Sequence, residues 1–299
     1  MKVLVTGGSG FIGSAVVDEL IAAGHEPIVI DRRIAKWTKR LSIPAYDMDV
    51  LDIFRLRNEF DAIIHMAALH IVSDSVKFAS DYYAHNINTL LQIIELEPKK
   101  LIYSSSAAVY GMGSVFTEKS PTNPINPYGR TKLWGEQILK DCNINHVSLR
   151  YFNAAGAGNN HGYVQKPRTH AVPIIMDCLH HDKQFTVFGE NLNTADGTCE
   201  RDYTHVKDIA IAHVKALEYN GNYNVMNIGS GKGTSMLELI REAETVTGKK
   251  LNWVFGEARN YDPPKLVADI TLAKNELKWE PKYTLTDIIR DAWKWENRV

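Results

Sequence analysis

The chain opens with an apolar run followed at once by closely spaced glycines, and this feature restricts its fold more than any other. KVLVT (2–6) has the apolar, β-branched composition of a buried strand. Gly7, Gly10 and Gly13 follow at three-residue intervals, and residues 11–23 continue with helical spacing. A strand, a glycine turn and a helix in this order form a site for a phosphate, because the bare backbone approaches closely and the helix N-terminus offers N–H groups.

The first half of the chain alternates short apolar runs with longer amphipathic segments. We expect strands at 2–6, 27–30, 62–66, 100–105 and 146–152, and helices at 11–23, 51–59, 74–96 and 127–143. Near-continuous apolar strands are typical of a parallel sheet that is covered on both faces. The alternation therefore predicts an α/β fold, a Rossmann-type doubly wound parallel sheet.

The second half is more mixed. We expect helices at 170–181, 207–219, 234–247 and 284–296, short strands at 185–188, 223–228 and 251–255, and a loop over the Gly- and Asn-rich residues 153–162.

Asp31 stands at the end of the second predicted strand, where a dinucleotide site places an acidic residue. Its carboxylate can accept hydrogen bonds from ribose hydroxyls and would repel a 2′-phosphate, which favours NAD over NADP. Arg32 and Arg33 follow directly and could hold that phosphate, so the preference stays open. The alternative reading of the glycines is a tight turn in a protein that binds no nucleotide.

Composition excludes several classes of function. With 34 basic and 35 acidic residues, the chain has no charge excess that predicts a nucleic-acid or membrane surface. The opening MKVLVTGGSG is already a strand and a turn and no apolar run is long, so we expect neither a secretory leader nor a membrane-spanning segment. Its three cysteines are widely spaced, which favours a reduced, cytoplasmic setting. Its eleven histidines form no HExxH pattern, and adjacent His180 and His181 are interpreted as ordinary surface or core residues, so we expect no metal site.

Tyr128 and Lys132 lie one helical turn apart in NPYGRTKLWGEQIL (126–139). An ammonium held near a phenol favours the phenolate, lowers the tyrosine pKa and provides a proton acceptor near neutral pH. Two amphipathic residues at this spacing also occur by chance on many helices, so the pair alone does not establish catalysis.

Further motifs resolve this choice. TGGSGFIG, SSSAAVYG, YGRTK and RYFNAAGAG occur in this order, and together they resemble the extended short-chain dehydrogenase/reductase family. DGTCERDYTHVKDIA (196–210) and NVMNIGSGKGTSMLEL (224–239) are similar to the UDP-glucose 4-epimerase (UDP-galactose 4-epimerase) branch of that family.

The resemblance implies a reaction and its catalytic residues. Tyr128 takes the proton from the sugar 4-hydroxyl, Lys132 binds the nicotinamide ribose and holds Tyr128 in a low-pKa state, and Ser106 hydrogen-bonds the 4-hydroxyl. A hydride passes from sugar C4 to bound NAD and returns to the other face of a 4-keto intermediate. UDP-glucose and UDP-galactose are thereby interconverted with no net redox change.

The resemblance also implies the binding residues. Besides Tyr128 and Lys132, the expected NAD contacts are Gly7, Gly10, Phe11, Ile12, Gly13, Asp31, Asp49, Val50, Met66, Ala67, Ala68, His70, Asn86, Ser104 and Tyr151. Besides Ser106, the expected UDP-sugar contacts are Asn153, His170, Ala171, Phe188, Arg201, Arg259, Asp262 and Leu266. An arginine can pair with a diphosphate bidentately, although most arginines form surface salt bridges.

Four positions separate this chain from other members of the family. Nucleotide-sugar dehydratases carry an acid pair just before VYG, where this chain has Ala107 and Ala108, which cannot move a proton. His70 replaces a lysine near the phosphates. Leu266 stands where the side chain sets the room at sugar C2; the alternative is that it is a core residue.

Several alternatives remain from the sequence. The sugar can instead be UDP-GlcNAc, a UDP-pentose or UDP-glucuronate, and a non-catalytic NAD-binding redox sensor is a further class. The family architecture implies an NAD-binding domain at 1–153, with 203–229 returning to it, and a smaller α/β UDP-sugar domain at 154–299. It also implies a homodimer that pairs helices 74–96 and 127–143, unless their apolar faces are core within one chain.

Overall fold

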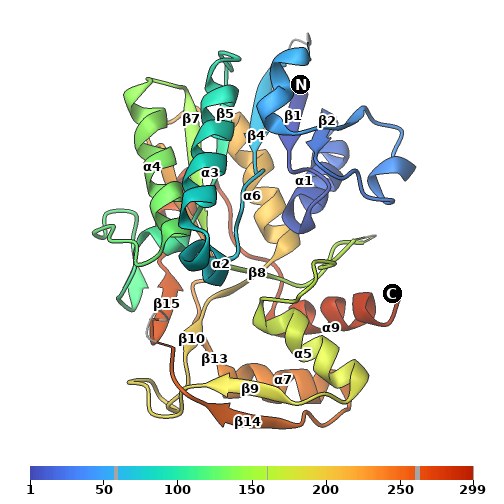
Figure 1. The fold of residues 1–299 in the computed structure, drawn as a ribbon, viewed down its shortest axis with the longest axis vertical. Helices are drawn as coiled ribbons and strands as arrows, with labels where there is room; N and C mark the ends of the chain where they lie inside the picture. Colours follow the sequence, from blue (N-terminus) through green and yellow to red (C-terminus); the bar gives the residue numbers. More distant parts are fainter. Residues whose placement is uncertain (57–59, 160, 260–262, 299) are drawn as a thin grey trace.

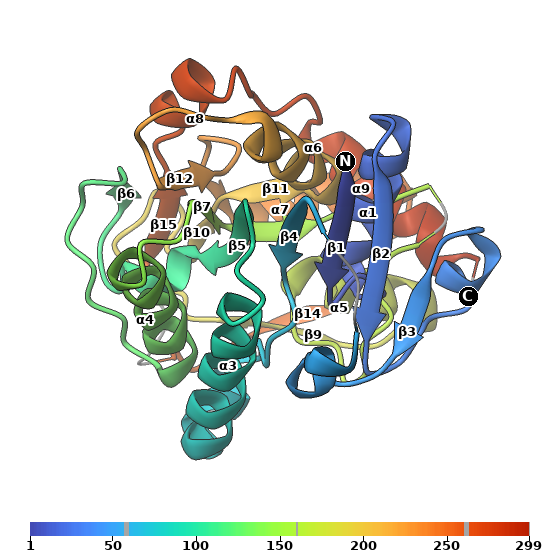
Figure 2. The same ribbon diagram turned by 90° about the horizontal axis from the view of Figure 1, so that it is seen from above.

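A seven-stranded parallel sheet forms the centre of the molecule (Figures 1 and 2). The computed structural model describes residues 1–56, 60–159, 161–259 and 263–298. In spatial order the strands are β12 (Val225–Ile228), β7 (His146–Tyr151), β5 (Leu101–Ser106), β4 (Ala62–His65), β1 (Lys2–Thr6), β2 (Glu26–Asp31) and β3 (Ala45–Asp47). The chain order reverses direction between β1 and β4, and in such sheets ligands bind outside the strand carboxyl ends at this point. The doubly wound fold expected from the sequence is confirmed.

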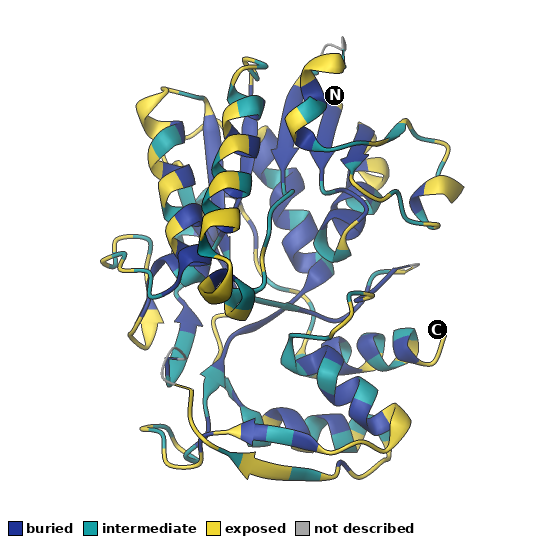
Figure 3. Ribbon diagram, in the orientation of Figure 1, coloured by how far each residue is buried: buried dark blue, intermediate teal, exposed yellow. Residues whose placement is uncertain are grey.

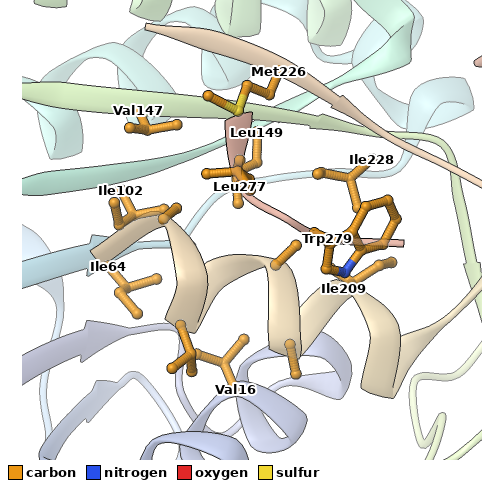
Figure 4. Packing of buried hydrophobic residues seen from close by; sticks show 14 of the residues in the cluster. Val16, Ile64, Ile102, Val147, Leu149, Ile209, Met226, Ile228, Leu277 and Trp279 are labelled. Carbon is orange, nitrogen blue, oxygen red and sulfur yellow. The ribbon is translucent and has the colours of Figure 1, made fainter. Parts of the chain in front are cut away.

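Helices cover both faces of this sheet. In Figure 2, α1 (Phe11–Ala22) and α6 (Val206–Glu218) lie on one face, while α3 (Ala79–Ile94) and α4 (Pro127–Asp141) lie on the other. Successive strand residues point to opposite faces. Ile64 and Ile102 therefore join the core under α1 and α6, drawn in Figure 4, whereas Ile63 and Leu101 join the core under α3.

The segment 206–228 contributes to this central layer although it follows much of the second half. Strand β12 pairs with β7, and α6 packs beside α1. Figure 4 shows Ile209 of α6 and Met226 and Ile228 of β12 in one cluster with Trp279.

A second layer of small sheets and helices lies beyond the carboxyl ends of the main sheet (Figure 1). Its strands are β6 (Val115–Phe116), β8 (Asn153–Ala155), β9 (Phe185–Phe188), β10 (Glu200–Arg201), β11 (Tyr203–His205), β13 (Thr234–Ser235), β14 (Trp253–Gly256) and β15 (Lys265–Ala268). They form a four-stranded sheet, β13-β10-β15-β6, and the two pairs β11-β8 and β14-β9. Helices α5 (Ala171–His181), α7 (Met236–Thr247) and α9 (Leu285–Glu296) share a separate apolar core.

The remaining elements are short: α2 (Val72–Lys77), α8 (Thr271–Glu276) and the 3₁₀ turns η1 (Thr38–Arg40), η2 (Val50–Arg55) and η3 (Ala107–Val109). Within the described residues, no helix combines the length and apolar character needed to cross a membrane.

Three secondary-structure expectations were wrong. The helix expected at 74–96 is two helices, α2 and α3, because Phe78 has φ −123° and ψ 50°, outside the helical region. The helix expected at 51–59 is the 3₁₀ turn η2, with residues 57–59 outside the described part. The loop expected at 153–162 begins as β8, whose partner β11 lies some fifty residues later in the chain and gives no local signal.

Candidate active site

The glycine turn (residues 7–13) lies where β1 enters α1, beside β4. A Cβ atom on Gly13 would lie 2.2 Å from the carbonyl oxygen of Gly7, and one on Gly7 would lie 2.9 Å from the Ala67 nitrogen. Gly7 also has φ 72°, which favours glycine. Gly10 is the N-cap residue of α1 and has no side chain to cap it, and the first residues of the helix line the cavity described below.

Asp31 ends β2 beside this turn. Its carboxylate accepts hydrogen bonds from the backbone N–H groups of Ser9, at 3.1 Å, and Arg33, at 3.2 Å. Burial raises the pKa of the Asp31 carboxyl, and these N–H donors oppose the rise. The acceptor expected from the sequence thus lies against the glycine turn.

Tyr128 and Lys132 lie in the first two turns of α4. The Asn126 side chain caps the helix by accepting a hydrogen bond from the Gly129 N–H at 2.8 Å, and Pro127 occupies the first turn. Gly129 lets α4 approach η3, because a Cβ there would lie 2.4 Å from the Ala108 carbonyl oxygen. Tyr128 is thereby brought within hydrogen-bonding reach of Ser106, at the end of β5.

Lys132 is almost fully buried, at 4% exposure. Its Nζ donates a hydrogen bond to the Ser104 carbonyl oxygen at 2.7 Å and lies 5.1 Å from the Tyr103 ring centroid and 5.9 Å from that of Tyr128. Burial lowers the pKa of Lys132 to about 7, and the negative charge of Glu136 opposes this change.

The sequence predicted that Lys132 lowers the Tyr128 pKa, and in the protein without bound ligands this prediction is wrong. Burial raises the pKa of the Tyr128 phenol, and the opposing effect comes from the hydrogen bond with Ser106. Because Tyr128 is buried, the cost of removing the phenolate from water is the larger effect, and the Lys132 ammonium is directed at the Ser104 carbonyl rather than at the phenol.

A cavity of about 500 Å³ connects the glycine turn with Tyr128 and Lys132. The expected residues on its wall are Gly7, Gly10, Phe11, Ile12, Gly13, Asp31, Asp49, Val50, Met66, Ala67, Ala68, His70, Ser106, Tyr128, Lys132, Tyr151, Asn153, His170, Arg201 and Leu266. They come from both the main sheet and the four-stranded sheet, so the cavity lies between the two layers.

Five of the expected residues that the structure describes do not lie on this wall. Asn86 and Ser104 stand behind it: the Asn86 amide binds the backbone of Leu69, and the Ser104 carbonyl accepts from Lys132. Ala171 is the first residue of α5, next to His170. Phe188 and Arg259 contact each other, with the guanidinium 3.7 Å from the ring centroid. Asp262 lies outside the described residues.

Comparison with known proteins agrees with this geometry. Residues 3–229 match the model of the family described as "NAD dependent epimerase/dehydratase family". The chain belongs to this family. The chain is 40% identical over 319 residues to a UDP-glucose 4-epimerase of Lactobacillus helveticus, a match that covers 99% of this chain and 97% of that protein.

Two solved structures show the same fold as this epimerase/dehydratase family member. One is UDP-glucose 4-epimerase from Bifidobacterium longum in complex with NAD⁺ and UDP, with TM-score 0.93 and 32% identity, covering 100% of this chain and 98% of that one. The other is the UDP-Glc/GlcNAc 4-epimerase of Campylobacter jejuni, with TM-score 0.85 and 33% identity, covering 100% and 99%.

The cavity fits the NAD that the family uses. The crowded glycine turn admits no side chain, the α1 N-terminus faces the cavity, and Asp31 lies beside both. The glycine turn and the α1 N-terminus suit a pyrophosphate, and Asp31 suits an adenosine ribose.

His70 and His170 lie together on the cavity wall, with ring centroids 6.3 Å apart. Burial lowers the pKa of His70, and burial followed by the charge of His70 lowers the pKa of His170 to about 4. The His170 imidazole is therefore neutral at pH 7, and the shift of the His70 pKa favours its neutral form as well.

Sequence reasoning missed several residues of the cavity wall, among them His85, Asn126, Tyr163, Gln165 and Pro263. Asn126 had a usable signal, since Asn followed by Pro before a helical pattern marks an N-cap. Tyr163 and Gln165 lie in irregular chain between β8 and α5, where no periodicity reports which way a side chain points.

One group of side chains among the described residues has spacing that could hold a metal ion: Asp177, His181 and Glu296. Arg168 binds both oxygens of Glu296, at 2.7 and 2.8 Å, and lies 3.5 Å from Asp177. Lys183 also contacts Asp177 at 2.9 Å. Because these cations already compensate both carboxylates, the group is a salt-bridge network between α5 and α9.

Proposed function

We propose that this protein is a UDP-glucose 4-epimerase, which interconverts UDP-glucose and UDP-galactose through a 4-keto intermediate. The observation that carries the proposal is the position of Tyr128, Lys132 and Ser106 on one cavity wall with the glycine turn. The identity of 40% to the Lactobacillus helveticus enzyme supports the same substrate.

In this proposal the Tyr128 oxygen takes the proton of the sugar 4-hydroxyl and later returns it, and the positive charge that bound NAD⁺ would bring opposes the rise in the Tyr128 pKa that burial causes. Ser106 hydrogen-bonds Tyr128 and orients the sugar 4-hydroxyl. The Ser106 oxygen accepts a hydrogen bond from the Ala108 N–H at 3.2 Å. Lys132, held by Ser104, orients the nicotinamide ribose. When bound, NAD supplies the acceptor for the hydride from sugar C4.

The cavity wall supports epimerisation over dehydration. Ala107 and Ala108 face the cavity where a dehydratase needs an acid and a base. An alanine side chain neither donates nor accepts a proton. Tyr128 and a hydride acceptor are sufficient for inversion at C4.

We assign the UDP-sugar to the half of the cavity lined by Asn153, His170, Arg201 and Leu266. Phe188 and Arg259 stack on each other outside this wall, and we assign them to the nucleotide part of the UDP-sugar. NAD then occupies the part made by residues 1–153 with 203–229, and the UDP-sugar is held mainly by the remainder of 154–299.

A second candidate is activity on UDP-GlcNAc as well. Leu266 is a medium-sized side chain on the cavity wall, and the similar Campylobacter jejuni enzyme is named for both sugars. Because the four-stranded sheet holds Leu266 in β15, its backbone has a fixed position at that wall.

The decisive experiment incubates the purified protein separately with UDP-glucose, UDP-GlcNAc, UDP-xylose and UDP-glucuronate and resolves the 4-epimers by chromatography. Conversion of UDP-glucose at the highest kcat/KM is expected. Tight NAD binding without conversion of any of the four sugars would instead support a redox sensor.

We also propose a cytoplasmic homodimer. Tyr83 of α3 and Trp134 of α4 stack with centroids 5.0 Å apart, and Trp134 and Leu91 remain 44% and 38% exposed. Figure 3 shows the outer sides of these helices as largely exposed. Light scattering on wild type and Trp134→Glu tests this proposal: the wild type should have twice the chain mass, and the variant should shift toward the monomer.

A further inference from the structure

Asp202 joins the two layers between which the cavity lies. It follows β10, the strand that carries Arg201 in the four-stranded sheet, and precedes β11, which pairs with β8. Its side chain is fully buried, at 0% exposure. The chain thus passes from one sheet to another at a single buried carboxylate.

Five hydrogen bonds from three other segments end on this carboxylate. One oxygen accepts from the Ser230 N–H at 2.6 Å, the Ser230 hydroxyl at 2.7 Å and the Thr204 hydroxyl at 3.4 Å. The other accepts from the N–H groups of Gly231, at 3.0 Å, and Ala268, at 3.2 Å. These donors replace the water that a buried carboxylate loses.

Those segments belong to different layers. Ser230 and Gly231 follow β12, which is a strand of the main sheet, whereas Ala268 ends β15 of the four-stranded sheet. The carboxylate therefore fixes the main sheet, which bears the glycine turn, relative to the sheet that bears Arg201 and Leu266.

The backbone of Asp202 extends the connection to the cavity wall. Its N–H donates to the Leu266 carbonyl at 3.1 Å. Its carbonyl accepts from the backbone N–H of Asn153 at 2.9 Å and from the Asn153 side-chain amide at 3.3 Å. Arg201 is its neighbour in the chain. Three residues of the cavity wall thus depend on the placement of one residue that does not line the cavity.

We propose that Asp202 is a positioning residue for the UDP-sugar: it sets Arg201, Asn153 and Leu266 at the correct place relative to Tyr128. The proposal rests on the assignment of the UDP-sugar to this half of the cavity. Asp202 does not contact the glycine turn in the bonds described, so it acts on the nucleotide-sugar rather than on NAD.

The test is Asp202→Asn. An amide has one acceptor oxygen and an NH₂ group, and each carboxylate oxygen of Asp202 now faces backbone N–H donors. In either orientation of the amide, one set of N–H donors faces the NH₂ group, which cannot accept a hydrogen bond. The contacts between the two sheets must therefore shift. We expect the Kd for UDP to rise about tenfold or more, which corresponds to a loss of about 1.4 kcal/mol of binding free energy.

Asp208 supplies a matched control. It is also 0% exposed, and its two oxygens accept the backbone N–H groups of Lys282 at 3.0 Å and Tyr283 at 3.1 Å. It connects α6 to the segment before α9 and does not line the cavity. Asp208→Asn should lower the melting temperature and leave the Kd for UDP unchanged.

The measurements are calorimetric titration with UDP, the amount of NAD released on denaturation, and kcat and KM for UDP-glucose. In Asp202→Asn, KM should rise more than kcat falls, with NAD content preserved. If Asp202→Asn does not fold, Ser230→Ala tests the proposal instead. This variant removes one hydrogen bond to the Asp202 carboxylate and should still raise the Kd for UDP, by a smaller factor.

An unchanged Kd for UDP in both Asp202→Asn and Ser230→Ala would overturn the proposal, as would an equal rise in Asp202→Asn and Asp208→Asn. A wild type that binds no UDP would overturn the proposed function itself, and the positioning role with it.

Discussion

Replacing Lys132 by methionine should stabilise the nucleotide-free protein while abolishing its activity. Lys132 is 4% exposed, and burial lowers its pKa to about 7 from an ordinary value of 10.5. The native state therefore holds a charge in a place where water cannot solvate it. Methionine has a similar length and no charge, so it removes this cost without emptying the site.

The pKa difference sets the size of the effect. At about 1.4 kcal/mol per pH unit, holding Lys132 protonated in the native state costs about 5 kcal/mol. Methionine forfeits the bond from Nζ to the Ser104 carbonyl, a loss of about 1–2 kcal/mol. The variant should therefore gain about 3 kcal/mol in free energy of unfolding at pH 6.

The gain should depend on pH in a defined direction. The unfolded chain binds the Lys132 proton up to about pH 10.5, whereas the native state releases it near pH 7, so this group makes the wild type more stable as the pH rises through that window. The full penalty is present below about pH 7, and by pH 9 it falls to about 2 kcal/mol. The difference between variant and wild type should shrink by about 3 kcal/mol between pH 6 and pH 9.

Urea unfolding of nucleotide-free wild type and Lys132→Met at pH 6 and pH 9 measures these values. Lys140→Met, an exposed position on the same helix, is the control and should change stability little at either pH. A Lys132→Met variant that is less stable than wild type at pH 6, or a difference that does not depend on pH, would refute the argument that desolvation dominates at Lys132.

Three further outcomes are expected. Tyr128→Phe should lower turnover by about 10²–10⁴-fold with NAD content and folding preserved, because only the ionisable oxygen is lost; wild-type rates would contradict the mechanism. Denaturation of the purified protein should release NAD, and NADP as the main species would show that Arg32 and Arg33 override Asp31. Leu266→Tyr should lower kcat/KM for UDP-GlcNAc more than for UDP-glucose, because the ring takes up room near sugar C2; a constant ratio would exclude Leu266 as the determinant.

The strand, glycine turn and helix at residues 2–23 were predictable because their signals are local. Glycine spacing, apolar periodicity and an acidic residue after the second strand lie within some thirty residues. The break at Phe78 was not predictable, since the surrounding sequence contains neither Gly nor Pro and only packing decides between one helix and two. The strand β8 was missed because its pairing partner, β11, is remote in the chain.

The sequence by itself determined the fold class, the glycine turn between strand and helix, and the one-turn spacing of Tyr128 and Lys132, since each depends on residues close together in the chain. Tertiary structure alone decided the pKa values of those residues and which other residues line the cavity. The pKa values of Tyr128 and Lys132 depend on burial, which comes from elements distributed over the whole chain. The place of Arg201 and Leu266 opposite Tyr128 depends on a carboxylate, Asp202, whose five donors come from segments up to 66 residues away. Solvation and long-range hydrogen bonding have no period in a sequence, so only the folded chain reveals them.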